Sequence, residues 1–142
     1  MNDRRSTFAL VAAASLLACF AFVSRDVNAG NGVSLSAAQV SSGSKAFAQN
    51  CASCHGAALE GGAGPPLSGA NFKTLSSKVH ATVGDIFSYM TSNMPMNAPA
   101  SLTHDQYVAI MAFILSKNGY QPSSSALTYS AAMQSKAPIQ RK

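Results

Sequence analysis

The stretch Cys51-Ala52-Ser53-Cys54-His55 decides how the rest of the chain is interpreted. Its pattern, C-x-x-C-H, is the signature of covalent attachment of a c-type haem. Two cysteines three positions apart lie on one face of a helical turn, so that each thiol can bond one vinyl group along the same edge of a porphyrin. The adjacent His55 can then offer an imidazole nitrogen to the iron. The motif therefore predicts one covalently bound haem c.

Other interpretations of the two cysteines account for less of the motif. In an oxidising compartment Cys51 and Cys54 could form a disulfide, but a disulfide gives no reason for His55. No alternation of strands and helices surrounds the pair, as a thioredoxin-like motif requires. A structural zinc site takes four ligands, and the chain has no second pair of cysteines. Haem attachment is the interpretation that accounts for all three residues.

Residues 1–29 have the pattern of a secretory signal peptide. Arg4 and Arg5 form a basic start, an apolar run covers residues 8–23, and small residues at 27–29 offer a cleavage site. We therefore expect an exported, periplasmic protein that begins at residue 30.

Two alternatives for this segment stay open. The apolar run could be a membrane anchor, although it is shorter than the ~20 residues that a helix needs to span a bilayer. Residues 16–19 could instead form a lipoprotein signal, with cleavage before Cys19 and acylation of its thiol. Membrane association is expected only if the signal is lipidated or retained.

The remaining residues, 30–142, have the length of one small domain. Such a chain buries only a modest core, so a covalently attached macrocycle would supply much of the missing apolar mass. Seven Lys and Arg stand against three Asp and Glu in this part, a net charge of +4. There is no basic run with interleaved aromatic residues, which argues against nucleic-acid binding. The mild positive charge favours encounter with an acidic redox partner, and it equally suits a surface that is merely soluble.

Capping signals and periodicity predict three main helices and no strand. The first helix begins after Ser36, where Gln39 completes a capping box, and it ends at the haem motif. Residues 56–71 contain five glycines and two prolines and are predicted to form a loop. A second helix follows Thr82, with apolar residues at helical spacing. The two prolines of residues 93–99 require the chain to leave that helix.

The last helix has the clearest boundaries. Thr103 and Gln106 form a capping box at its start, and Asn118-Gly119 ends it. Its buried stripe is predicted to consist of Tyr107, Ile110, Met111 and Ile114. Residues 121–142 are predicted to form a polar, Ser-rich tail with three anchors: Leu127, Tyr129 and Met133. The fold class is therefore all-α.

In the order of their motifs, residues 36–120 resemble the class I cytochromes c. These are small all-α proteins with an N-terminal haem motif and a methionine late in the chain. Four matches in order carry the resemblance: Phe47 before the haem motif, Gly64-Pro65-Pro66-Leu67-Ser68-Gly69, Asn93-Met94-Pro95 and Ala112-Phe113-Ile114-Leu115. The stretch from Asn93 to Leu115 is similar to the cytochromes that serve periplasmic quinoprotein alcohol dehydrogenases. The family often has a tryptophan between the proline loop and the third helix, whereas this chain has none.

The resemblance implies a class I fold in which Gly43 and Phe47 of the first helix cross the last helix near Phe113. A glycine at the crossing permits close approach of the two backbones. The resemblance also implies that the carbonyl of Pro65 accepts a hydrogen bond from the second imidazole nitrogen of His55. Such a bond fixes the ring and makes it a better donor to iron. From the residues alone, Pro65 is an ordinary turn proline.

Several side chains could supply the second axial ligand of the iron: His80, His104, Met90, Met94, Met96, Met111 and Met133. Met90 and Met111 lie on apolar helical faces and are predicted to be core residues. His104 lies at a helix start and is predicted to be on the surface. His80 would give a bis-histidine haem. Met94 and Met96 lie in a loop restricted by prolines, where holding a thioether on iron costs less chain entropy. The family places its ligand in a methionine–proline pair, which selects Met94.

With His55 and Met94 as ligands, the iron would have no open position for a substrate. The expected function is therefore single-electron transfer between redox protein partners, such as a dehydrogenase or a terminal oxidase, with no catalysis and no small-molecule substrate. Two alternatives stay open. The chain could be a fixed cytochrome subunit of a dehydrogenase or oxidase complex, docked through its tail, or a five-coordinate haem enzyme or gas sensor.

Overall fold

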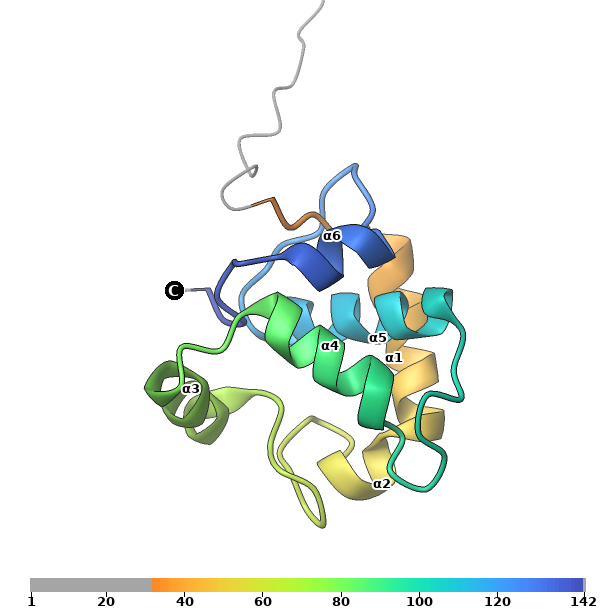
Figure 1. Cartoon of the computed structure of the whole chain (residues 1–142), viewed down its shortest axis with the longest axis vertical. Helices are drawn as coiled ribbons and strands as arrows, with labels where there is room; N and C mark the ends of the chain where they lie inside the picture. The colour runs from red at the N-terminus through yellow and green to blue at the C-terminus, as the bar shows by residue number, and fades with distance from the viewer. Residues whose placement is uncertain (1–31, 142) are drawn as a thin grey trace, which may run out of the picture.

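The structure is a computed structural model that describes residues 32–141. This part of the chain is all-α, as predicted, and apart from two isolated bridges it contains no β-structure. Its helices are α1 (Ala37–Asn50), α2 (Ala52–His55), α3 (Gly69–Lys78), α4 (Val83–Asn93), α5 (His104–Lys117) and α6 (Tyr129–Gln134) (Figure 1). The predicted signal peptide, with Cys19, lies outside the described residues. Across residues 32–141, no helix has both the length and the apolar character that a membrane span needs.

Helices α1 and α5 form the main helix pair and cross at a glycine. A Cβ atom placed on Gly43 would lie 1.8 Å from the backbone oxygen of Ala109 and 3.0 Å from the Cβ of Phe113. Just beyond the crossing, the rings of Phe47 and Phe113 pack with centroids 5.4 Å apart. The crossing predicted for Gly43, Phe47 and Phe113 is therefore present, and only a glycine fits at its centre.

Three helices begin with capping boxes, two of which the sequence predicts; at α4 the sequence predicts only the cap residue, Thr82. In α1 the box joins Ser36 and Gln39, and in α5 it joins Thr103 and Gln106. In α4 the Oγ1 of Thr82 accepts from the backbone nitrogen of Asp85 at 3.1 Å, and a carboxylate oxygen of Asp85 accepts from the backbone nitrogen of Thr82 at 3.0 Å. These local bonds set the starts of the three main helices.

The segment after α5 packs back onto α4 instead of extending as a polar tail. Its backbone bonds the start of α4, with the Val83 nitrogen 2.8 Å from the Ala137 oxygen and the Gly84 nitrogen 3.0 Å from the Ser135 oxygen. Apolar side chains of the segment are buried in the core: Leu127, Ala132, Ala137 and Ile139. Of the three predicted anchors, Leu127 is buried, Tyr129 half-buried and Met133 exposed. Residues 121–141 are thus part of the domain.

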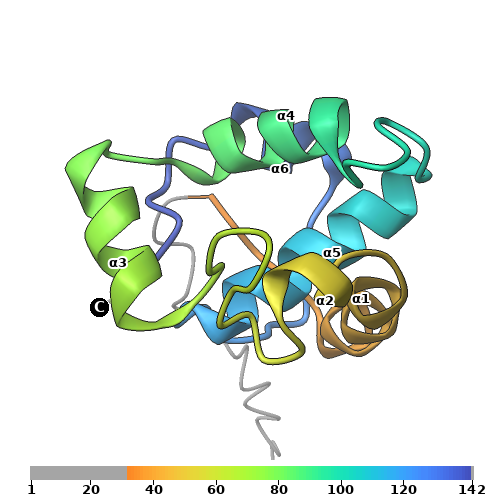
Figure 2. The ribbon, with the colours of Figure 1, turned by 90° about the horizontal axis from the view of Figure 1, so that it is seen from below.

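Helix α3 is the outlying helix of the fold. In Figures 1 and 2 it lies to one side of the other helices, and Phe72 is the large side chain that ties it to the core. The glycines and prolines of residues 56–71 predict a loop, whereas the structure begins α3 at Gly69. The helix has a weak apolar stripe, since Phe72 is buried and Leu75 is 52% exposed. This is why periodicity did not reveal it.

Replacing Thr82 with Ala is expected to lower the free energy of unfolding by about 1 kcal/mol at neutral pH, the usual contribution of a helix cap. The hydrogen bonds from Thr82 hold the pKa of Asp85 below its usual value of 3.8. A depressed carboxyl pKa stabilises the fold above the unfolded-state pKa, and this stabilisation is lost as the pH falls through the folded-state pKa. Denaturant titrations at pH 7 and at about pH 3 should therefore show a smaller deficit in acid.

The matched control is Thr128→Ala, because Thr128 caps α6 through the nitrogen of Ala131 with no carboxylate partner in its cap. Its deficit should be the same at both pH values. An equal deficit for Thr82→Ala at both pH values would show that Asp85 does not take part in the cap.

Candidate haem site

The five residues of the C-x-x-C-H motif form one helical turn at the junction of α1 and α2. Cys51 ends α1 and caps α2, and its backbone oxygen accepts from the nitrogen of Cys54 at 3.2 Å and from that of His55 at 2.9 Å. Both cysteines are free thiols, Cys51 half-buried and Cys54 exposed. Burial, with a smaller contribution from the neighbouring Cys54, raises the pKa of Cys51 to about 11. The arrangement therefore presents two unpaired thiols and an imidazole on a single turn.

The imidazole of His55 is buried and is held by the loop that follows it. Its Nδ1 lies 2.8 Å from the backbone oxygen of Pro65, the contact that the resemblance implied. A Cβ atom on Gly64 would lie 2.9 Å from the Cε1 of His55, so the backbone of this residue rests against the ring. With Nδ1 donating to Pro65, Nε2 is the nitrogen that can bind iron.

The loop between α2 and α3 is itself fixed by backbone hydrogen bonds to the motif. The nitrogen of Gly61 lies 2.8 Å from the oxygen of His55, and that of Gly64 lies 2.8 Å from the oxygen of Cys54. Further along, the nitrogen of Leu67 bonds the oxygen of the buried Leu59 at 2.9 Å. These hydrogen bonds hold the loop, and with it Pro65, in a fixed position relative to His55.

Met94 lies where α4 ends and the proline-containing loop begins. It caps the C-terminus of α4, its nitrogen bonds the oxygen of Met90 at 3.0 Å, and its half-buried side chain packs against the core. Its backbone oxygen accepts a hydrogen bond of 2.6 Å from the hydroxyl of Tyr107 in α5. Met96, two residues on, is 75% exposed. Of the two methionines in this loop, only Met94 is held against the interior.

The other ligand candidates have different surroundings. As predicted, Met90 and Met111 are buried in the core and His104 is on the surface, where its ring stacks on Tyr129 with centroids 3.9 Å apart. His80 and Met133 are both exposed. Within residues 32–141 no three His, Cys, Asp or Glu side chains gather into a cluster that could hold a bare metal ion.

The side chains that the structure provides suit an iron porphyrin. Two thiols on one turn, a buried imidazole with one nitrogen committed to a carbonyl, and a thioether on a restrained loop are donors that a covalently bound haem with two axial ligands can use. Cys51, Cys54, His55 and Met94 could therefore hold such a group, with Pro65 supporting the histidine.

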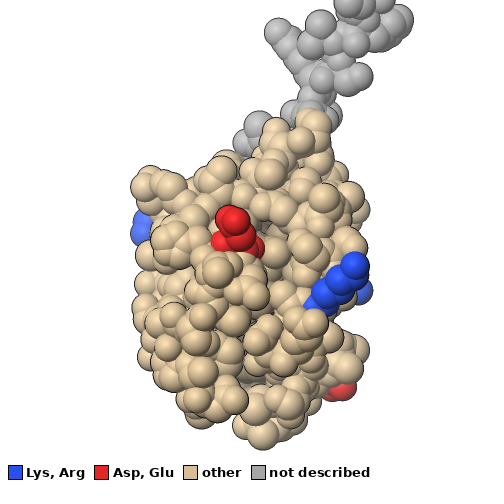
Figure 3. Space-filling view, turned by 90° about the vertical axis from the view of Figure 1, so that its right-hand side faces the viewer, with Lys and Arg blue, Asp and Glu red and all other residues tan. Residues whose placement is uncertain are grey.

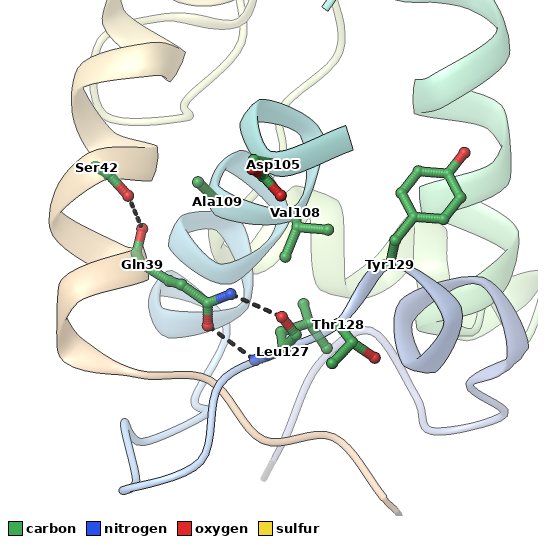
Figure 4. Close-up of a pocket in the computed structure, with 8 residues that line it drawn as sticks. All are labelled: Gln39, Ser42, Asp105, Val108, Ala109, Leu127, Thr128 and Tyr129. Carbon is green, nitrogen blue, oxygen red and sulfur yellow. Dashed lines mark hydrogen bonds between the residues drawn. The ribbon is translucent and has the colours of Figure 1, made fainter. Parts of the chain in front are cut away.

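A separate hollow lies between α1, α5 and the residues before α6 (Figure 4). Its volume is about 400 Å³. Its lining residues are Gln39, Ser42, Asp105, Val108, Ala109, Leu127, Thr128 and Tyr129. The side-chain amide of Gln39 is engaged in holding the chain together, because it bonds both the nitrogen and the oxygen of Leu127, at 2.8 and 2.7 Å. The hollow includes none of the proposed haem-binding residues.

Comparison with known proteins shows the family of this chain. The family model described as cytochrome c oxidase, cbb3-type, subunit III, matches residues 38–114, more than half of the chain. The chain belongs to this cytochrome family. Its cofactor is accordingly a covalently bound haem c with iron, and it is a monohaem electron-transfer cytochrome of class I fold.

A solved structure supports the same assignment. The sulfane dehydrogenase SoxCD from Paracoccus pantotrophus is 32% identical to this cytochrome, with a TM-score of 0.51. The match covers 67% of this chain and 51% of the other, so the cytochrome spans about half the length of that chain. No curated protein sequence matches it significantly. The likeness to cytochromes of alcohol dehydrogenases stays a prediction.

Two polar residues near the site of this cytochrome were not identified from sequence. Tyr107 was predicted only as part of a buried stripe, and Asn118 only as a helix end. The structure places the Tyr107 hydroxyl on Met94 and the Asn118 amide on the loop that carries Pro65. Their partners are backbone oxygens, which have no sequence signature, so no motif could have revealed these contacts.

Proposed function

We propose that this cytochrome holds its haem through thioether bonds to Cys51 and Cys54, with His55 and Met94 as axial ligands, and passes single electrons between redox proteins in the periplasm. The observation that carries the proposal is the turn 51–55, with two free thiols beside an imidazole that is held on the Pro65 carbonyl. Export to the periplasm is supported by the signal pattern of residues 1–29.

When bound, the haem supplies a one-electron redox couple. The protein contributes attachment, orientation and exclusion of water. Cys51 and Cys54 would attach the haem to the α1–α2 junction through thioether bonds, and the Pro65 carbonyl keeps the ring of His55 in one orientation and increases its basicity. Met94 would supply the second ligand to the iron, so that no ligand position would remain for a substrate. Methionine in place of a second histidine raises the reduction potential.

We propose that the partner is a redox enzyme and that the two proteins meet through surfaces with little charge. The similarity to part of the sulfane dehydrogenase SoxCD supports a place in, or beside, such an enzyme complex. Two segments at the proposed site, residues 46–59 and 86–103, contain no Asp, Glu, Lys or Arg. On the face shown in Figure 3 the acidic and basic side chains are few and scattered. Such a surface favours contact through uncharged groups over long-range steering.

Replacing Met94 with Ala is expected to remove the sixth ligand. The red-region charge-transfer band of the oxidised protein, which reports sulfur on iron, should disappear. The reduction potential should fall on the order of 0.1 V, within the ~0.8 V range that axial ligands span. The reduced variant should bind carbon monoxide rapidly, whereas the wild-type protein should be inert. Visible spectra and a redox titration measure all three.

Met96→Ala is the matched control. It removes the same type of side chain two residues further along the loop, at a position that is 75% exposed. It should keep the band and the wild-type potential. If the band survives in Met94→Ala, Met94 is not the ligand. Rapid carbon monoxide binding by the wild-type protein would favour a five-coordinate haem enzyme or gas sensor.

A further inference from the structure

Helix α5 carries a polar, buried side chain near each of its ends, and each donates to the backbone of a different loop. Near the start, Tyr107 is 3% exposed and its hydroxyl lies 2.6 Å from the oxygen of Met94. At the end, Asn118 is 6% exposed and its Nδ2 lies 2.8 Å from the oxygen of Leu67. The same nitrogen lies 2.8 Å from the oxygen of Ile114. Both side chains are therefore committed to backbone carbonyls.

The two loops that these side chains reach lie next to the proposed axial ligands. One begins at Met94, and the other carries Pro65, whose carbonyl holds His55 of α2. Met94 is itself the proposed sixth ligand, and its carbonyl is the point at which the chain leaves α4. Leu67 lies two residues after Pro65, whose oxygen accepts from Nδ1 of His55. One helix is thus bonded directly to the loop of Met94 and to the loop that orients His55.

Their spacing along α5 places the two contacts on the same side of the helix. Eleven residues correspond to about three turns, so positions 107 and 118 share a face and are separated by about 16 Å along the axis. The helix between them is firmly held, because residues 107–115 are all buried and Thr103 and Gln106 cap its start. A rigid element with an anchor at either end can hold two loops at a constant separation.

We propose that Tyr107 and Asn118 are positioning residues for the haem. From one face of α5, Tyr107 holds the Met94 loop and Asn118 holds the loop that orients His55, so that this helix sets the separation of the two axial ligands. The inference rests on the proposed function, in which His55 and Met94 are those ligands. Neither residue is assigned contact with the haem.

The energetic reason is that movement of a ligand loop helps the ligand to leave the iron, and this movement breaks the anchoring bond. A neutral hydrogen bond of this kind contributes about 1 kcal/mol, or roughly fivefold in an equilibrium constant. When the loop moves, the carbonyl of Met94 loses its hydrogen-bond donor, which adds to the free-energy cost of that movement. Removing the Tyr107 hydroxyl should therefore make Met94 easier to displace, even though the methionine itself is unchanged.

The first test compares Tyr107→Phe with Tyr120→Phe in the haem-loaded protein. Tyr120 is also buried and its hydroxyl also donates to a backbone oxygen, that of Pro138, far along the chain from either ligand loop. Imidazole is the probe, because it displaces methionine from oxidised haem and abolishes the sulfur charge-transfer band. We expect imidazole to bind Tyr107→Phe about fivefold more tightly than wild type and Tyr120→Phe with wild-type affinity.

Equal imidazole affinity in the two variants would overturn the role of Tyr107 while leaving the ligation by Met94 intact. A wild-type protein without the sulfur band would instead overturn the ligation itself, and the inference with it. The failure of the inference and that of the proposed function therefore give different results.

The second test compares Asn118→Ala with Gln140→Ala. Gln140 donates to the Oδ1 of Asn118 at 3.0 Å, so its removal leaves both Asn118 donor bonds in place. Hydrogen exchange of the Nδ1 proton of His55, followed by NMR, reports opening of the Pro65 contact. We expect exchange to be about fivefold faster or more in Asn118→Ala and unchanged in Gln140→Ala. Unchanged exchange in Asn118→Ala would overturn its role. Should that variant not fold, the Tyr107 comparison decides the proposal alone.

Discussion

The double substitution Cys51→Ser, Cys54→Ser is expected to abolish covalent attachment of the haem. Both thiols lie free on the turn 51–55, and a hydroxyl does not form the thioether bond that holds the macrocycle. Denatured chains separated on a gel and stained for haem peroxidase activity should show no signal, against a full signal for wild type. Each single substitution leaves at most one thioether and should lose most of the stain.

Ser53→Ala is the matched control, because Ser53 lies between the two cysteines on the same exposed turn. It should keep the full signal. A double variant that still carried haem through denaturation would show that the bond is made elsewhere in the chain. The covalent attachment proposed for Cys51 and Cys54 would then be wrong.

Gly43→Ala is expected to destabilise the packing of α1 against α5. The added Cβ would lie 1.8 Å from the backbone oxygen of Ala109, which cannot move aside as a flexible side chain can. The helices must then separate, at a cost of about 3 kcal/mol, the upper end of the usual range for an overpacked core. The better helix propensity of alanine returns at most about 1 kcal/mol. Denaturant unfolding should therefore show a net loss of about 2 kcal/mol.

Ser44→Ala controls for propensity, since its neighbouring position on α1 is exposed. It should leave the free energy of unfolding unchanged or raise it by a few tenths of a kcal/mol. Gly43→Ala should thus lower the free energy of unfolding, whereas Ser44→Ala should not, although both substitutions are in α1. A Gly43→Ala protein as stable as Ser44→Ala would mean that α1 and α5 do not cross at this glycine.

The haem motif and the helix starts were predictable because they depend on neighbours in sequence. The capping boxes at Ser36, Thr82 and Thr103 each join residues three positions apart, and all three are present. The glycine crossing at Gly43 came from the family resemblance. Its physical reason, a carbonyl of α5 in the space of a side chain, became visible only in the structure.

The packing of the C-terminal segment was not predictable in the same way. Its composition is polar and Ser-rich, but a few apolar residues, such as Leu127 and Ile139, are enough to bury it. Its main attachment is through backbone hydrogen bonds to the start of α4, with the nitrogen of Val83 on the oxygen of Ala137. Backbone groups are the same in every residue, so composition carries no information about such pairing.

The residues alone were enough to identify the haem attached at residues 51–55, the all-α domain and the three helix starts. The groups that hold the ligand loops became visible only in the folded chain. The partners of Tyr107 and Asn118 are carbonyls 13 and 51 residues away. The physical reason is that thiol, imidazole and capping chemistry belongs to particular side chains at short spacing, whereas a carbonyl becomes a specific partner only when folding brings it within hydrogen-bond distance.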